Sequence, residues 1–362
     1  MLKKELIMGV LDKNNKKEIE KYNEFIVSNE TTSVMQTMEW AKLKSTWNYE
    51  VVYTEKDNKI VMSALVLIKR IPGINMDLFY IPRGPIGDLK NSQDLNNLLK
   101  EIDKLKEKYK PFMLTCDPQI SNGKELSNSL KNNNCSIKKH SAYDIYQPKY
   151  NFVIKVNENM SDDDILKNFS SSSRTNVRKS IKKGCTIRVS SSKEDLQKFF
   201  DLHYETGKRS NFITRPYKYY ETLLDLLGEK SFKIFLIEND GICYASNIGL
   251  QFGNKLWYLA GGTSMERKEL KPSYLVQFSM FKYCTENNLK YYELGGVYYP
   301  DDRDPVYTFK RKLSTDDDFI EYIGEIQYVY NKFIYVTFNN VLIPLLNVKR
   351  KAIRLVKKIL KK

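Results

Sequence analysis

The feature that most restricts the fold of this chain is an internal repeat with a spacing of about 180 residues. In the first half, residues 50–70 read as two strands around a turn, followed by a strand near Phe79, a helix over 92–109 and a strand near Phe112. The second half repeats this order and ends in a strand near Tyr291. Because a steady offset across three separate elements is hard to obtain by chance, the repeat predicts two related β-β-β-α-β units.

Two strands of the second half each end in paired glycines. They are KLWYLAGG at 255–262 and LKYYELGG at 289–296, with an amphipathic helix expected over 272–287 between them. Bare backbone at one end of a sheet, beside the start of a helix, is a common way to hold an acyl carbonyl or a phosphate. This pattern favours group transfer over a scaffolding role.

Composition excludes several kinds of chemistry. The chain has only two histidines, His140 and His203, too few for a His-rich zinc site or a Ser-His-Asp triad. The HExxH, P-loop, GxGxxG and GxSxG patterns are absent, and the five scattered cysteines are typical of reduced thiols in a cytosolic protein. We therefore expect neither a metal nor a cofactor. Backbone donors and cations remain, a set suited to attack by an amine on an ester activated elsewhere.

Positive charge is concentrated at the end of the chain. The net charge is +15, and residues 349–362 hold eight cations and no acid. Ile353, Val356 and Leu360 line one face of a helix there, which predicts a basic C-terminal helix. Such a helix either packs on the body with its lysines in water or lies on an anionic membrane surface, and the density of cations favours the membrane.

A second basic face is expected on a helix that begins after Ser170 and ends at Gly184. Arg174, Arg178 and Lys182 are spaced by four residues and lie on one side of it. The ordinary reading is a solvated surface, and the functional reading is a contact with a nucleic-acid phosphate backbone.

The chain resembles the Fem-type (FemABX) aminoacyltransferases across nearly its whole length. Five segments carry the resemblance: QTMEWAKLKSTW (36–47), YIPRGPIGD (80–88), SSSSRTNVRKSIKKGCTI (170–187), ETGKRSNFITRPYKYY (205–220) and residues 255–313. The resemblance implies an α/β protein with mixed sheets, made of two tandem GNAT-like (acetyltransferase-type) domains. No heptad run is present, so we expect no coiled-coil arm.

The resemblance and the repeat together predict a division of the chain into three segments. Residues 1–148 form the first GNAT-like domain, completed by the C-terminal segment, and residues 149–320 form the second. Residues 321–362 hold a return segment and the basic helix.

The activity that the resemblance implies is transfer of an amino acid, Gly, Ala or Ser, from aminoacyl-tRNA to a peptidoglycan precursor. The acceptor is the side-chain amine of the stem peptide, on lipid II or UDP-MurNAc-pentapeptide, and the product is the interpeptide bridge. Aminoacyl-tRNA is then a co-substrate, and related Fem-type transferases are further partners. The basic tail favours lipid II, with the protein cytoplasmic and peripheral at the inner face of the cell membrane.

Residue by residue, the resemblance places Lys310 and its neighbour Phe309 at the acyl acceptor. Lys310 would stabilise the tetrahedral intermediate and the tRNA leaving oxygen. Asp117, in the strand-end sequence TCDP, matches an aspartate once considered as a base, but a turn cap is its ordinary role and we leave it out of the catalytic set.

The implied substrate-binding residues are cations and tyrosines, each of which could instead be an ordinary surface or core residue. They are Lys44, Arg215, Tyr219 and Tyr258, with Arg209 as an alternative position for the arginine. The Arg174, Arg178 and Lys182 face is the candidate for tRNA binding.

Two alternatives remain open. One is a GNAT-like N-acyltransferase that uses acyl-CoA, although the Q/R-x-x-G-x-G/A pyrophosphate signature is missing. The other is a non-catalytic protein that binds membranes or RNA, which would not require Lys44, Arg215 and Lys310 to converge.

Overall fold

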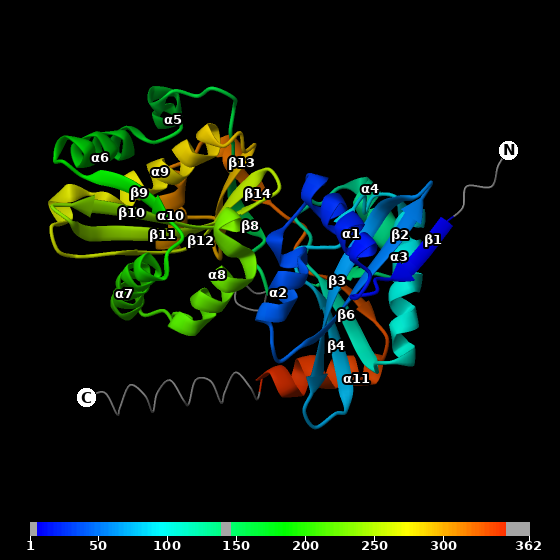
Figure 1. Cartoon of the computed structure of the whole chain (residues 1–362). Helices are drawn as coiled ribbons and strands as arrows, with labels where there is room; N and C mark the ends of the chain where they lie inside the picture. Colours follow the sequence, from blue (N-terminus) through cyan, green and yellow to red (C-terminus); the bar gives the residue numbers. More distant parts are fainter. Residues whose placement is uncertain (1–5, 139–145, 345–362) are drawn as a thin grey trace.

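The computed structural model describes residues 6–138 and 146–344, which fold into two halves, each built on one sheet (Figure 1). The strands of the first sheet are β1 (Leu6–Val10), β2 (Asn48–Lys56), β3 (Lys59–Ile71), β4 (Met76–Ile81), β5 (Ile86–Gly87), β6 (Pro111–Cys116), β7 (Ser136–Ile137) and β15 (Ile326–Val329). Their order is β1-β2-β3-β4-β6-β15-β7, with β5 paired to β3.

The second sheet occupies the other half of the molecule. Its strands are β8 (Tyr150–Lys155), β9 (Thr186–Ser190), β10 (Phe232–Asn239), β11 (Ile242–Phe252), β12 (Lys255–Thr263), β13 (Tyr291–Val297) and β14 (Phe319–Glu321). Their order is β14-β8-β13-β12-β11-β10-β9.

Helices cover both sheets. They are α1 (Lys16–Ser28), α2 (Met38–Leu43), α3 (Ser92–Lys104), α4 (Lys124–Asn132), α5 (Asp162–Lys167), α6 (Ser171–Lys182), α7 (Lys193–Ser210), α8 (Tyr217–Ser231), α9 (Pro272–Glu286), α10 (Pro305–Arg311) and α11 (Lys332–Thr337), which continues into η5 (Phe338–Leu342). Among the described residues the longest is α7, with 18 residues, so this part of the chain contains no long coiled-coil arm.

The repeat expected from the sequence is confirmed by the strand pairing. In each half an antiparallel hairpin, β2–β3 or β10–β11, leads to a third strand, and a helix then crosses to a strand parallel to that third strand. The parallel pairs are β4 with β6 and β12 with β13. A parallel pair requires such a crossover, which α3 and α9 supply. The chain is therefore a mixed α/β protein with two related sheets.

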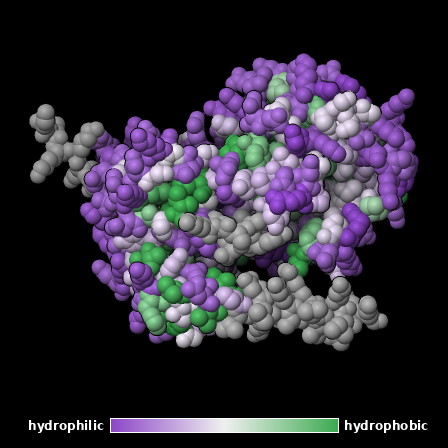
Figure 2. Space-filling model, turned by 180° about the vertical axis from the view of Figure 1, so that it is seen from behind, coloured by the Kyte–Doolittle hydropathy of each residue, from purple (hydrophilic) through white to green (hydrophobic). Residues whose placement is uncertain are grey.

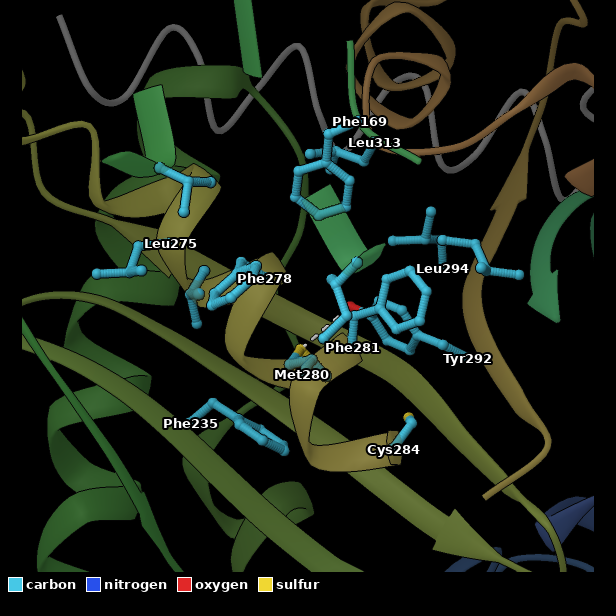
Figure 3. Packing of buried hydrophobic residues seen from close by; sticks show 14 of the residues in the cluster. Phe169, Phe235, Leu275, Phe278, Met280, Phe281, Cys284, Tyr292, Leu294 and Leu313 are labelled. Atoms are coloured by element: carbon cyan, nitrogen blue, oxygen red, sulfur yellow. Dashed lines mark hydrogen bonds between the residues drawn. The ribbon is translucent and has the colours of Figure 1, made fainter. Parts of the chain in front are cut away.

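Helix α9 was expected to be amphipathic, but it carries few charges and is covered on both sides. Phe278, Phe281 and Cys284 are buried, and they pack with Phe235 and Tyr292 of the second sheet (Figure 3). Residues of α5 and α6 close the same core from the outside. A helix buried on two sides needs no polar face, which explains its composition.

The C-terminal part of the described chain returns to the first half. After β14 pairs with β8 in the second sheet, β15 pairs with β6 and β7 in the first. Helix α11 lies beneath the first sheet, drawn in red in Figure 1. The basic helix expected near residue 349 lies outside the described residues. Between residues 6 and 344, leaving out 139–145, no helix has the length and hydrophobicity needed to cross a membrane.

Candidate functional site

The site begins where two parallel strands of the second sheet separate. Strands β12 and β13 pair only over Lys255–Trp257 and Tyr291–Glu293. Beyond this point β12 follows β11 and β13 follows β8, each with a bulge in its register. Gly295 stands at the bulge of β13 with φ +80°, a left-handed conformation that favours glycine. In the first sheet, β4 and β6 stay paired to Ile81 and Cys116, so the same notch does not open there.

The notch opens into a cleft of ≈ 810 Å³ between the two halves. Both halves and the segment that joins them contribute to its walls. The lining includes Ser33, Met35, Arg83 and Gln119 from the first half, Gln147 and Pro148 from the joining segment, and Trp257, Tyr258, Glu293, Gly296, Phe309 and Lys310 from the second.

The paired glycines lie at the ends of β12 and β13, as expected, with one further residue of each strand after them. Close packing explains three of them. A Cβ on Gly262 would come within 2.3 Å of the backbone of α7, one on Gly261 within 2.0 Å of Asn247, and one on Gly296 within 2.3 Å of Pro148. The glycines therefore let a helix and the joining segment approach the strands, and the backbone cradle inferred from the sequence is not their main role.

Lys310 lies at the bottom of this notch. It comes from the short helix α10, is 6% exposed, and its Nζ donates a hydrogen bond of 3.0 Å to the carbonyl oxygen of Gly296. Burial lowers the pKa of the Lys310 ammonium from 10.5 to about 7, and Asp304 opposes part of this change. A buried amine of this kind can supply a cation or a proton donor to a reacting group in the cleft.

Phe309 and Tyr258 lie in the same cleft as Lys310. Phe309 packs against the core of the second half, with its ring 5.8 Å from that of Tyr274. Tyr258 comes from the diverging part of β12, and burial raises its pKa to about 12. Its hydroxyl therefore stays protonated at neutral pH and is available as a donor.

A second cluster contains Lys44, Arg215 and Tyr219. The Lys44 ammonium lies 5.1 Å from the Trp40 ring and 5.8 Å from the Tyr219 ring, and the Arg215 guanidinium lies 5.5 Å from the Tyr219 ring. Burial lowers the pKa of Lys44, and repulsion from Arg215 lowers it further. In the described part of the chain neither cation forms an ion pair with a carboxylate, so the cluster carries excess positive charge.

Tryptophans connect the two clusters. Trp40, beneath Lys44, lies 6.2 Å from Trp257, ring centre to ring centre. Trp257 lines the cleft, and its Nε1 would lie 3.6 Å from a Cβ on Gly295, next to the Lys310 amine. The candidate residues of the first and second halves are thus linked by one run of contacts.

The remaining candidates are not brought into the cleft. Arg209 is exposed at the end of α7 and donates to the carbonyl oxygen of Thr263 at 3.2 Å. On α6, Arg178 pairs with Asp163 at 3.1 Å, and Lys182 is exposed. Helix α6 lies on the outer side of the second half, away from the first (Figure 1). Its basic face, which includes Arg174, is a separate surface.

Sequence reasoning missed a polar group at the floor of the cleft. Lys255 and Glu293 form an ion pair of 3.1 Å, and each is less than a tenth exposed. Gln119, from the first half, donates to Glu293 at 3.3 Å. The charges in the otherwise aromatic strands around 255 and 293 were the available signal, but only the packed halves show that the two charges meet.

Asp117 holds the loop beside the cleft. It accepts hydrogen bonds from the Tyr80 hydroxyl at 2.7 Å and from the backbone N–H of Arg83 at 2.6 Å. Burial raises the pKa of its carboxyl to about 6. Both oxygens are occupied, so the geometry gives Asp117 a positioning role.

Comparison with known proteins identifies the family. The FemAB family model matches residues 18–240, and a model of the acetyltransferase (GNAT) domain matches residues 171–311. A UDP-N-acetylmuramoylpentapeptide-lysine N(6)-alanyltransferase of Weissella viridescens is 25% identical, over 91% of this chain and 98% of that protein. A lipid II:glycine glycyltransferase of Staphylococcus aureus strain MRSA252 is 26% identical, over 94% and 98%.

Solved structures agree on the fold. The crystal structure of FemX is similar with a TM-score of 0.82 at 23% identity, over 91% of this chain and 98% of that one. A tandem GNAT protein from the clavulanic acid biosynthesis pathway is similar with a TM-score of 0.52 at 8% identity, over 90% and 98%. The two-sheet architecture is thus that of FemX and of tandem GNAT proteins. The chain belongs to the FemAB family and is an aminoacyltransferase, as its sequence motifs predicted.

Proposed function

We propose that this chain transfers an alanyl or glycyl group from aminoacyl-tRNA to the side-chain amine of the stem peptide of a peptidoglycan precursor. The names of the two relatives support these acyl groups and acceptors, because one is an alanyltransferase that acts on a UDP-linked pentapeptide and the other a glycyltransferase that acts on lipid II. The observation that carries the proposal is the buried Lys310 amine at the notch of an open cleft between two halves.

The chemistry follows from this position. The acceptor amine attacks the carbonyl carbon of the aminoacyl ester, a C–N bond forms, and the C–O bond to the ribose breaks. Lys310 stabilises the negative charge that develops on the carbonyl oxygen and then on the leaving ribose oxygen. The amine loses a proton and the ribose oxygen gains one, and hydroxyl or phosphate groups of the tRNA relay it. Phe309 and Tyr258 bound the space in which the two substrates meet.

The cluster of Lys44, Arg215 and Tyr219 suits the diphosphate that both candidate acceptors carry. Burial lowers the pKa of Lys44, and repulsion from Arg215 lowers it further. A bound dianion would relieve this repulsion and draw on both charges. Arg209 and the basic face of α6, with Arg174, Arg178 and Lys182, are further sites for the tRNA backbone, which basic surfaces attract.

Lipid II is the acceptor that we favour, because an exposed apolar surface leads into the basic tail. Phe333 is 77% exposed, and Val336 and Val341 are about half exposed on α11 and η5. Figure 2 shows apolar side chains gathered at the lower edge of the molecule, where α11 lies. Apolar side chains followed by eight cations match the requirements of an anionic membrane surface. The protein would then act at the inner face of the cell membrane.

The membrane contact is tested by deleting residues 349–362. The truncated protein should lose binding to vesicles of anionic lipid and lose activity on lipid II, while it keeps activity on UDP-MurNAc-pentapeptide. Unchanged vesicle binding and unchanged activity on lipid II would remove this part of the proposal.

The reaction is tested by incubating the protein with alanyl- or glycyl-tRNA and each acceptor, and measuring the mass of the product. Lys310→Ala should lower kcat by about 100- to 1,000-fold, the usual cost of losing one oxyanion donor. Lys312→Ala, two residues further on and exposed, is the matched control and should keep full activity. A loss of less than about tenfold in Lys310→Ala would contradict the proposed role, since tenfold is only about 1.4 kcal/mol.

A further inference from the structure

Arg83 is a buried cation that forms no ion pair with a carboxylate of the described residues. It lies in the loop between β4 and β5, is 6% exposed, and lines the cleft. Its Nη2 donates to the carbonyl oxygen of Pro148 at 2.9 Å, and its guanidinium stacks 5.4 Å from the Tyr322 ring. Across residues 6–138 and 146–344, its Nε and Nη1 have no hydrogen-bond partner and the side chain forms no ion pair.

The surroundings hold Arg83 rigidly. Asp117 interacts electrostatically with it but uses its two oxygens for the Arg83 backbone N–H and the Tyr80 hydroxyl. The other acid at the floor of the cleft, Glu293, is paired with Lys255. The backbone of Arg83 and the face and one edge of its guanidinium are therefore fixed. The remaining N–H donors of the guanidinium are unused.

Arg188 provides a comparison within the same chain. Its guanidinium makes two hydrogen bonds to Asp195, at 2.6 and 2.7 Å, and two more to Glu238. Arg188 is paired on every side although it is more exposed than Arg83. A buried charge without such partners is costly. At Arg83 this desolvation cost remains, and because the side chain lines the cleft, a bound anion would offset it.

Arg83 and Lys310 form hydrogen bonds on either side of one contact, between Pro148 of the joining segment and Gly296 of β13. Arg83 donates to the carbonyl of Pro148, and the Pro148 ring packs against Gly296, whose carbonyl accepts from Lys310. Both side chains therefore line one cleft, Arg83 from the first half and Lys310 from the second. Gln119 and Asn151 line the same walls, and their amides are engaged there, Gln119 with Glu293 and Asn151 with the carbonyl oxygen of Pro148.

We infer that Arg83 binds a carboxylate of the acceptor peptide and so positions its amine at Lys310. This inference rests on the proposed function. A planar guanidinium with one free edge matches a carboxylate, which accepts two parallel hydrogen bonds. Arg83 is buried in the wall of the cleft, where a short peptide can reach it. A tRNA backbone is instead bound by exposed cations.

The test combines variants of Arg83 with acceptors in which one carboxylate at a time is replaced by a carboxamide. Arg83→Gln should raise KM for the acceptor by about 10- to 100-fold, the range for a lost hydrogen bond to a charged group, with an unchanged KM for aminoacyl-tRNA. One of the amidated acceptors should raise KM for the wild type by a similar factor. That acceptor should show no further loss with Arg83→Gln, because the two changes remove the same contact.

Two further variants complete the design. Arg83→Lys keeps the charge but not the fork and should recover only part of the affinity. Arg267→Gln, an exposed arginine paired with Asp240 and Glu269, is the control and should behave as wild type. Thermal unfolding of each variant identifies any that fail to fold.

Three results would overturn the inference. First, Arg83→Gln could raise KM by the same factor for every acceptor, amidated or not. The residue would then have a structural role, through its hydrogen bond to Pro148. Second, Arg83→Gln could raise KM for aminoacyl-tRNA instead, which would assign the residue to a nucleic-acid phosphate. Third, the wild-type protein could show the same KM for all the amidated acceptors as for the unmodified one. Failure of the proposed function is separate, because the wild type would then form no product with any unmodified acceptor.

Discussion

The charge of Lys310 should lower the stability of the folded protein, and replacing it should reveal by how much. Its pKa falls from 10.5 to about 7 on burial. Each pKa unit corresponds to about 1.4 kcal/mol, so the buried amine costs at most about 5 kcal/mol. Lys310→Met removes the charge but also the hydrogen bond to Gly296, worth roughly 1–2 kcal/mol. The variant should therefore gain roughly 3 kcal/mol of stability at pH 6.

This gain should depend on pH in a defined direction. Because the folded pKa of Lys310 is lower than the unfolded one, the penalty is complete below about pH 7. It declines by about 1.4 kcal/mol per pH unit above pH 7 and vanishes near pH 10.5. At pH 9 the advantage of Lys310→Met over wild type should be less than about 1 kcal/mol.

The assay is urea unfolding of wild type, Lys310→Met and the exposed control Lys312→Met at pH 6, 7.5 and 9. The control should follow the wild type at every pH. A Lys310→Met variant that is less stable than wild type at pH 6, or whose gain does not change with pH, would refute the reasoning. The variant should also lose transferase activity, which would show that stability is sacrificed for the reaction.

Other consequences of the structure are testable in the same way. Lys44→Ala should raise KM for the acceptor by about tenfold or more with little change in kcat, and an unchanged KM would exclude the phosphate contact. Gly262→Ala should lose about 1–3 kcal/mol in denaturant unfolding, since its Cβ would lie 2.3 Å from backbone, whereas Gly123→Ala, with open space around it, should not. Arg188→Met should lower the free energy of unfolding by about 1 kcal/mol at pH 7, because the exposure of the arginine limits what its ion pairs contribute. Because Arg188 holds the pKa of Asp195 below its ordinary 3.8, this difference should fade as pH drops below that value, and a difference constant with pH would contradict the pairing.

The repeat was predictable because each of its elements has a local signal. Alternating apolar residues, turns such as Asn-Asp-Gly at 239–241 and the start of α9 at Pro272 all depend on neighbours in the chain. The return of the C-terminal segment to the first sheet, in contrast, has no local signal. Strand β15 is four residues long, and its pairing with β6 joins residues about 210 positions apart, so no local pattern assigns its register.

The position of the paired glycines shows the limit more clearly. Sequence marks Gly261, Gly262, Gly295 and Gly296 as unusual but does not say what approaches them. In the structure α7 and Pro148 occupy the space that side chains would need. The sequence pattern therefore located the site, whereas the reason for the glycines depended on contacts with distant residues.

By itself, the sequence determined the family, the repeated α/β units and the residues able to carry charge, since these follow from local patterns and motifs. Only the tertiary structure decided the environment of those charges. It buried Lys310 against Gly296, set Lys44 beside Arg215, and left Arg83 without an ion pair to any described residue of the cleft. The physical reason is that a side chain's pKa and partners depend on desolvation and on neighbours from other elements, which a linear sequence does not contain.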